Sequence, residues 1–99
     1  MDFTVQFSDE AIVEYTEAIL WYDHQLENLS DRSMTEIDNI IAVIRNNPFQ
    51  FPILKKQFRQ CVSQVFPFII IYTVKNDVIF VTSVFHTSRN PTMKFKKSK

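Results

Sequence analysis

The opening residues alternate in polarity and then change to a helical pattern. Residues 3–7, Phe-Thr-Val-Gln-Phe, alternate between apolar and polar side chains, which predicts a half-buried strand. Ser8 suits a helix N-cap, and Asp9 and Glu10 favour the positive end of a helix dipole. Apolar residues then recur every three or four positions, at Ile12, Tyr15, Ile19, Tyr22, Leu26 and Leu29. This spacing predicts a helix of about twenty residues whose apolar stripe faces the core.

A second helical pattern follows almost at once. Ser30 and Asp31 form another helix-start signal, and the apolar stripe continues through Met34, Ile37, Ile41 and Ile44. The pattern ends at Asn46-Asn47-Pro48, because proline cannot continue a helix. Since the link between the two helices is short, we expect them to form an antiparallel hairpin.

The remaining apolar segments are typical of strands. After Pro52, residues 58–65, 68–74 and 78–86 are rich in β-branched and aromatic side chains, and Lys75-Asn76-Asp77 suits a hairpin turn. Residues 69–71 are all isoleucine, which predicts a central strand covered by the helices on one face and half-buried on the other. The sequence therefore predicts an α+β fold of order β-α-α-β-β-β, with the helical hairpin on one face of a mainly antiparallel sheet.

Composition removes several classes of function. The chain has 99 residues, 45% of them apolar, which is enough for one packed domain, expected over residues 1–92, with a basic tail at 93–99. No glycine is present, so the glycine-rich loops that cradle nucleotide phosphates are excluded. A single cysteine, Cys61, leaves no basis for a disulfide scaffold or a zinc site. The sequence shows no signal peptide and no membrane span, so we expect a cytoplasmic protein. We also expect neither a cofactor nor a metal.

Charge is strongly divided along the chain. Residues 1–44 hold ten acids and one cation, Arg32, whereas residues 45–99 hold ten cations and one acid, Asp77, so −9 is followed by +9. Such a division suggests that the basic half binds a polyanion. Alternatively, the helices have acidic solvated faces and the lysines near the end of the chain only improve solubility.

The order of these segments resembles that of the RelE/ParE superfamily, the type II toxin-antitoxin toxins also called plasmid stabilisation proteins. The resemblance covers residues 2–91 and rests on the helical hairpin with Trp21-Tyr22, the Asn47-Pro48 break, Arg59, Phe66-Pro67-Phe68, and the closing 84–91 segment Val-Phe-His-Thr-Ser-Arg-Asn-Pro. It implies a cognate antitoxin whose extended or helical segment wraps the toxin, in a homo- or hetero-oligomer with that antitoxin. It also implies growth arrest, either by inhibition of DNA gyrase without catalysis or by cleavage of mRNA on the ribosome.

Three residues are candidates for catalysis if the protein is a nuclease. His86 closes the last strand, and imidazole is a general acid or base near neutral pH. Arg59 and Arg89 have forked donors that suit a crowded phosphate. Alternatively, His86 shapes the end of the strand, and the arginines bind antitoxin carboxylates or hold the sheet.

Target binding has a wider set of candidates. Lys55 and Lys56 precede the strand that carries Arg59, and the resemblance implies that they lie where ribosome-dependent members have lysines that contact RNA; alternatively, they are a solvated loop pair. Arg59 and Arg89 are further candidates for contact with the target. Tyr72 is suited to stacking on a base, but a tyrosine in so apolar a strand is also typical of a core.

Two departures from the nuclease pattern favour the ParE-like alternative. No tyrosine follows Tyr72, and the only carboxylate of the basic half, Asp77, falls in a turn. We therefore expect a gyrase inhibitor. The alternatives are a ribosome-dependent endoribonuclease and a non-toxic module that binds an antitoxin.

Overall fold

The computed structural model describes residues 3–25, 29–63 and 68–86 of the chain. It contains two helices and five strands, in the order β1 (Thr4–Phe7), α1 (Asp9–Gln25), α2 (Leu29–Asn46), β2 (Ile53–Lys55), β3 (Phe58–Val62), β4 (Phe68–Lys75) and β5 (Val78–His86). The predicted α+β class is confirmed, and β2 is an addition to the predicted order. The predicted tail at 93–99 and Arg89 lie outside the described residues.

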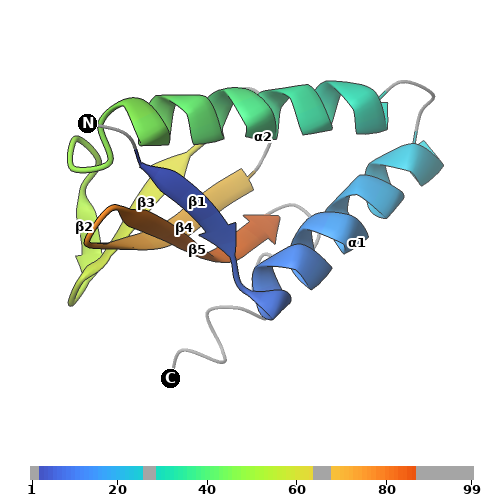
Figure 1. Cartoon of the computed structure of the whole chain (residues 1–99). Coiled ribbons are helices and arrows are strands. Elements are labelled where there is room, and N and C mark those ends of the chain that lie inside the picture. Colours follow the sequence, from blue (N-terminus) through green and yellow to red (C-terminus); the bar gives the residue numbers. More distant parts are fainter. Residues whose placement is uncertain (1–2, 26–28, 64–67, 87–99) are drawn as a thin grey trace.

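All five strands form one sheet, with both helices on the same face (Figure 1). The strand order is β1-β5-β4-β3-β2, so the first and last strands are neighbours. β1 runs parallel to β5, and every other pairing is antiparallel. In the central strand, Ile70 is buried while Ile69 and Ile71 are half-buried. The sheet therefore has one covered face and one partly open face, as the sequence predicts.

The start of α1 is confirmed, but its buried face differs from the predicted stripe. The Ala11 N–H donates to Ser8 Oγ over 3.0 Å, which is the N-cap bond, and the Ser8 hydroxyl donates to the Thr82 carbonyl over 3.3 Å. Ala11 and Ala18 are buried, whereas Ile12 is 49% exposed. Small alanines allow the helix backbone to approach the sheet closely, so the larger Ile12 is turned outward.

The second helix shows a smaller shift. It begins at Leu29, so Ser30 lies inside its first turn and is not the predicted N-cap. Ile37 and Ile44 are buried as predicted, while Ile40 replaces Ile41 as the third core position and Met34 is 41% exposed. No helix in the described ranges is long and apolar enough to cross a membrane.

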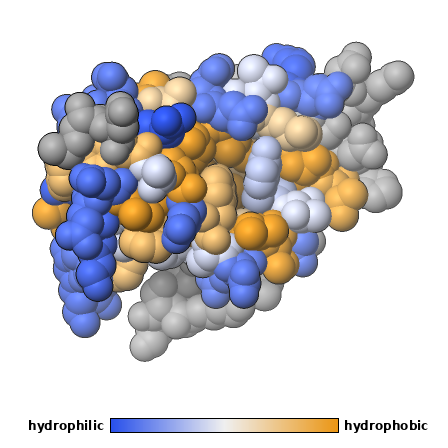
Figure 2. Space-filling view, in the orientation of Figure 1, coloured by the Kyte–Doolittle hydropathy of each residue, from blue (hydrophilic) through white to orange (hydrophobic). Residues whose placement is uncertain are grey.

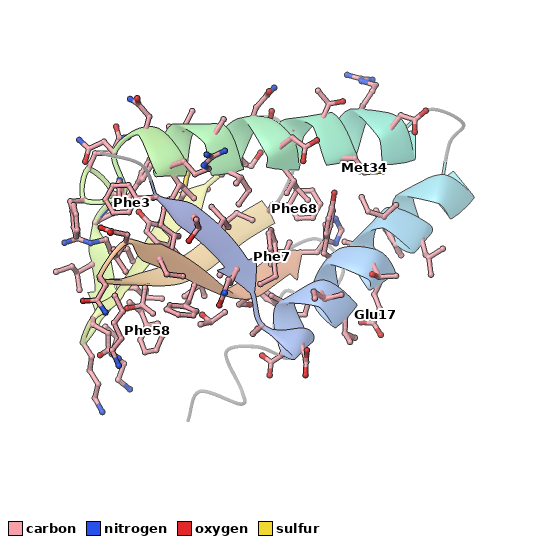
Figure 3. All side chains as sticks on the ribbon, viewed as in Figure 1. Phe3, Phe7, Glu17, Met34, Phe58 and Phe68 are labelled. Atoms are coloured by element: carbon pink, nitrogen blue, oxygen red, sulfur yellow. The ribbon has the colours of Figure 1, made fainter. Side chains whose placement is uncertain are left out.

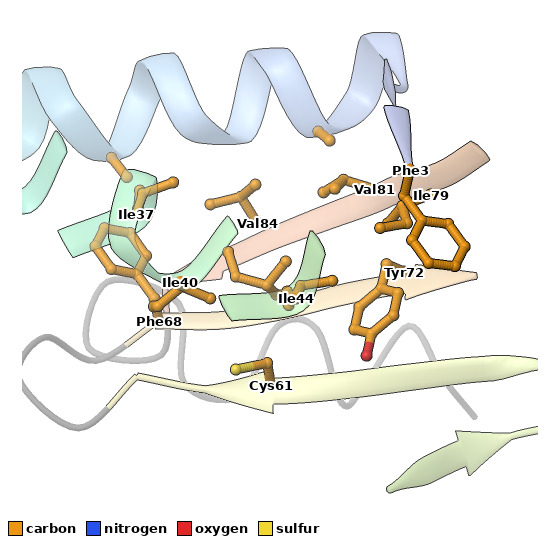
Figure 4. Close-up of a cluster of buried hydrophobic side chains, with 13 residues drawn as sticks. Phe3, Ile37, Ile40, Ile44, Cys61, Phe68, Tyr72, Ile79, Val81 and Val84 are labelled. Carbon is orange, nitrogen blue, oxygen red and sulfur yellow. The ribbon is translucent and has the colours of Figure 1, made fainter. Parts of the chain in front are cut away.

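The core lies between the two helices and the covered face of β3, β4 and β5. Figure 4 shows Ile37, Ile40 and Ile44 of α2 above Phe68 and Tyr72 of β4. Phe68 and Tyr72 are the largest fully buried side chains among the described residues. Burying a side chain of this size contributes about 1.5–3 kcal/mol, so these two residues of β4 contribute strongly to the core beneath α2.

Candidate functional site

The structure places Arg59 and Tyr72 side by side, where they hold the segment that follows α2. The two residues are paired across β3 and β4, and both face the helices. The Tyr72 hydroxyl donates to the Pro48 carbonyl over 2.6 Å. Arg59 Nη1 donates to the Phe49 and Phe51 carbonyls over 3.2 and 2.6 Å. Both side chains therefore tie residues 48–51 to the sheet.

Tyr72 is fully buried, and its ionisation reflects this environment. Burial raises the pKa of Tyr72 to about 12, against the opposing effect of the Arg59 guanidinium. At neutral pH the phenol stays protonated and donates to Pro48. Stacking on a base, which the sequence suggested, requires a ring face that this packing occupies.

Arg59 also contacts an aromatic ring of the segment that it holds. It is half-buried, and its guanidinium carbon lies 5.5 Å from the centre of the Phe49 ring. Both of its hydrogen bonds to described groups use Nη1.

A bulge in β5 decides where His86 points. Tyr72 is paired with Val81 but Ile71 with Ser83, so Thr82 is an extra residue in β5. Because side chains alternate along a strand, one extra residue moves every later side chain to the opposite face. Without the bulge, His86 would face away from the helices.

With the bulge, His86 lies in the covered layer beneath α1. It is 5% exposed, and its ring centre is 4.9 Å from that of Trp21 and 5.3 Å from that of Phe68. The stripe predicted for the first helix did not include Trp21. A substrate therefore has little access to the His86 imidazole.

His86 and Arg59 do not meet. Arg59 is paired with Tyr72 and His86 with Phe68, and these partners are four residues apart on β4. At about 3.3 Å per residue and about 4.8 Å between strands, the register separates the two backbones by about 13 Å along the sheet and about 10 Å across it. Arg59 is bonded to the Phe49 and Phe51 carbonyls and His86 packs against Trp21 and Phe68, so the two side chains do not converge on one site.

Lys55 and Lys56 are exposed at the turn between β2 and β3. Lys55 is paired with Phe58, so Lys56 and Gln57 form a two-residue connection, in which Lys56 has a φ of 55°. The Thr73 hydroxyl donates to the Gln57 carbonyl over 3.2 Å, which fixes the turn against β4. Figure 2 shows hydrophilic surface at this end of the sheet. We call Lys55, Lys56 and Gln57 the basic turn.

Two carboxylates that were not predicted from the sequence attach the helices to the sheet. Glu14 of α1 accepts from the Ser83 hydroxyl and the Val84 N–H over 2.8 and 2.9 Å. Glu36 of α2 accepts from the Ser63 hydroxyl over 2.8 Å. The available signals were Ser83 within the mainly apolar β5 and Ser63 directly after β3. Within the described ranges, no group of three His, Cys, Asp or Glu residues could hold a metal ion.

A helical hairpin over one face of this five-stranded sheet is the RelE/ParE-type toxin fold. A chain of the chromosomal ParDE TA system from P. aeruginosa superposes with a TM-score of 0.67 at 16% identity, covering 85% of this chain and 95% of that chain. A chain of the E. coli DinJ-YafQ toxin-antitoxin complex superposes with a TM-score of 0.59 at 11% identity, covering 90% and 97%. No protein-family model and no curated protein matches the sequence.

Proposed function

We propose that this protein is the toxin of a type II toxin-antitoxin pair, which arrests growth in the cytoplasm unless a cognate antitoxin binds it. The observation that carries the proposal is the fold, which extends over nearly the whole of chains from two toxin-antitoxin structures, one of them described as a complex. At these identities the fold alone is shared, so the activity has to be tested directly.

For the mode of arrest, we propose inhibition of DNA gyrase without catalysis. The burial of His86 against Trp21 supports this choice, because an endoribonuclease needs its general acid or base within hydrogen-bond reach of the substrate. The separation of His86 from Arg59 also supports it. The contact with the target is proposed to involve Lys55, Lys56 and Arg59, whose cations lie at one end of the sheet.

A ribosome-dependent endoribonuclease is the second candidate. The basic turn favours it, since two adjacent exposed lysines suit a phosphate backbone. In that case Arg89 would have to supply part of the site, together with an imidazole that this structure places in the covered layer.

Induction of the protein alone in growing bacteria tests the proposal. We expect growth arrest with a DNA-damage response and without codon-phased 5′ ends in mRNA. Codon-phased ends would instead support the endoribonuclease, and normal growth at high expression would favour a non-toxic antitoxin-binding module.

The variant His86→Phe separates the two modes of arrest further. Phenylalanine keeps an aromatic ring between Trp21 and Phe68 but has no titratable nitrogen. We expect arrest to persist in a variant whose circular dichroism and unfolding midpoint match the parent. Loss of arrest in such a folded variant would contradict the gyrase proposal.

The double variant Lys55→Gln and Lys56→Asn tests the basic turn. Asparagine tolerates a positive φ better than lysine, so removing the Lys56 charge does not strain the turn. We expect growth arrest to be lost while the protein stays folded. The matched control is Arg32→Gln with Arg45→Gln, which removes two exposed cations from α2 and should leave the arrest intact.

A further inference from the structure

The outer edge of β2 presents backbone groups that the sheet does not use. Among the described strands, β2 pairs only with β3. Ile53 is paired with Arg59, and the Gln60 N–H donates to the Pro52 carbonyl over 3.2 Å. In an antiparallel ladder, a bond between these flanking positions makes Ile53 and Arg59 a non-hydrogen-bonded pair, so the N–H and the carbonyl of Ile53 point away from β3. Ile53 therefore offers a donor and an acceptor at the outer edge.

Apolar side chains lie at the same edge. Ile53 and Leu54 are 58% and 48% exposed, and Phe49, whose ring contacts the Arg59 guanidinium, is 56% exposed. Figure 1 shows β2 at the margin of the sheet, at the end away from α1. A strand added to an edge forms main-chain hydrogen bonds and covers neighbouring side chains, and the outer edge of β2 offers both kinds of contact.

The charge at this edge is positive. Residues 45–63 contain four cations and no acid. Lys55 and Lys56 are exposed, and neither forms an ion pair with an acid of the described ranges. Figure 3 shows side chains with nitrogen ends extending from this end of the sheet, beside Phe58. A strand that binds here therefore gains from Asp or Glu residues of its own.

These features together indicate which occupant fits. A second copy of the chain would add its own cations to the same short edge, and like charges oppose association. A nucleic acid would neutralise the lysines, but it cannot form a strand ladder with Ile53. An extended peptide segment with apolar and acidic residues matches the backbone groups, the apolar side chains and the cations.

We propose that the outer edge of β2 binds an extended, acidic segment of a partner protein as an additional strand. Apolar residues of this segment pack against Ile53 and Leu54, and its Asp or Glu residues lie beside Lys55 and Lys56. The proposal goes beyond the toxin function, because it depends only on this edge and holds equally for a protein that arrests nothing. Since Lys55 belongs both to β2 and to the basic turn, a partner bound here also keeps a polyanionic target away from that turn.

Two synthetic peptides of about ten residues, the length of a long strand, test the role of charge. One alternates Val with Glu, and the other alternates Val with Lys. Binding to the full chain is measured by fluorescence anisotropy. We expect the Glu peptide to bind and the Lys peptide to bind at least about tenfold more weakly.

Hydrogen exchange at Ile53 locates the contact. Its N–H points away from β3 in the free protein and is bonded to the added strand in the complex. We expect exchange of the Ile53 amide, followed by NMR, to slow at least about tenfold at saturation with the Glu peptide. Binding through the lysine charges alone would leave the exchange rate of this amide unchanged.

Two variants of Ile53 separate the backbone from the side chain. Ile53→Pro removes the outward N–H, which β3 does not use, and proline is tolerated on an edge strand in this position. Ile53→Ala is the matched control, because it shortens the side chain and keeps the N–H. Provided that both variants match the parent in circular dichroism, the Pro variant should bind the Glu peptide at least about fivefold more weakly than the Ala variant.

Two double variants test the cations. Lys55→Gln with Lys56→Asn should lower the affinity for the Glu peptide at least about tenfold. Arg32→Gln with Arg45→Gln removes two exposed cations from α2 and should leave this affinity unchanged.

Four results would overturn the proposal. The first is equal binding of the Glu and Lys peptides, and the second is unchanged exchange of the Ile53 amide at saturation. The third is equal protection of this amide by a single-stranded RNA, because a nucleic acid would then occupy the edge. The fourth is a dimer of the free protein, detected by sedimentation equilibrium and abolished by Ile53→Pro, because a second copy would then be the occupant.

Discussion

Single hydrogen bonds hold residues 48–51 against the sheet, and the Tyr72 hydroxyl makes the most buried of them. Tyr72→Phe keeps the ring in the core but leaves the Pro48 carbonyl without its donor. We expect a loss of about 1–2 kcal/mol in the free energy of unfolding, measured by urea denaturation.

Tyr15→Phe is the matched control for this prediction. Tyr15 is half-buried, its ring stacks on Phe7, and no described group hydrogen-bonds to its hydroxyl. Its substitution should change the free energy of unfolding by less than about 0.5 kcal/mol. Equal losses in the two variants would mean that the bond to Pro48 adds nothing to stability.

The ionisation of Tyr72 lowers the stability of the fold at alkaline pH. Tyr72 has a pKa of about 12 in the folded protein and 10.0 when unfolded. Between these values the unfolded chain releases the phenol proton while the folded chain keeps it, so stability is full below pH 10 and falls as the pH rises towards 12. Urea midpoints over this range should fall less steeply in Tyr72→Phe than in the parent. Parallel curves would contradict the buried, protonated phenol.

Burial also raises the pKa of Tyr15, together with the negative charge of Asp38, and the pKa of the Cys61 thiol, together with that of Glu36. Tyr72→Phe should therefore reduce the alkaline decline without removing it. The difference between the two curves isolates the contribution of Tyr72.

At the scale of the elements, the carboxylates of Glu14 and Glu36 determine how each helix sits on the sheet. β1 is paired with β5 only as far as Val81, and beyond it Glu14 accepts the N–H of Val84. Glu14→Ala leaves that N–H and the Ser83 hydroxyl without this acceptor. We expect a loss of about 2–3 kcal/mol, with faster hydrogen exchange at Val84.

Glu36→Ala provides the comparison, because Glu36 accepts one such bond, from Ser63. Its cost should be smaller, about 1–2 kcal/mol, and should leave the exchange of the Val84 amide nearly unchanged. If Glu36→Ala cost more than Glu14→Ala, the two carboxylates would not have the roles assigned to them.

The sequence was informative about where elements begin and end. Ser8 marked the start of α1, Pro48 marked the end of α2, and Asn76, whose φ is 57°, marked the turn before β5. These signals are local, since each depends on the backbone chemistry of one or two residues.

It was harder to predict which side of a helix faces the sheet and in which register the strands pair, because both depend on contacts between distant segments. Ile12 appeared to be a core position, yet Ala11 is buried because it allows α1 to lie close to β5. The extra Thr82 in β5 has no signal of its own, and it is what turns His86 inward. The largest difference between the predicted and the observed site is therefore the position of His86, because the extra Thr82 reverses the alternation of side chains in β5.

At the scale of the whole molecule, β1 completes the sheet at the edge of β5. Its Val5 and Phe7 pack against the core, and its backbone shields the first half of β5. Deleting residues 1–7 would expose this edge, and exposed edges pair with other chains. We expect the truncated protein to self-associate in size-exclusion chromatography and to lose cooperative unfolding.

Deleting residues 1–2 alone serves as the control, because it leaves β1 intact. That protein should elute and unfold like the parent. A monomeric, cooperatively folded protein after deletion of residues 1–7 would show that β1 is dispensable.

The parallel pairing of Thr4 with Val78 also orders events during translation. The two positions are 74 residues apart, so at about 5–20 residues per second the ribosome needs about 4–15 seconds to synthesise the partner of β1 after β1 itself. During that interval β1 has no partner strand, and the sheet lacks β5. Any activity that needs the complete five-stranded sheet is thus delayed until almost the whole polypeptide has been made. A binding partner therefore has time to bind the nascent chain before the protein can act.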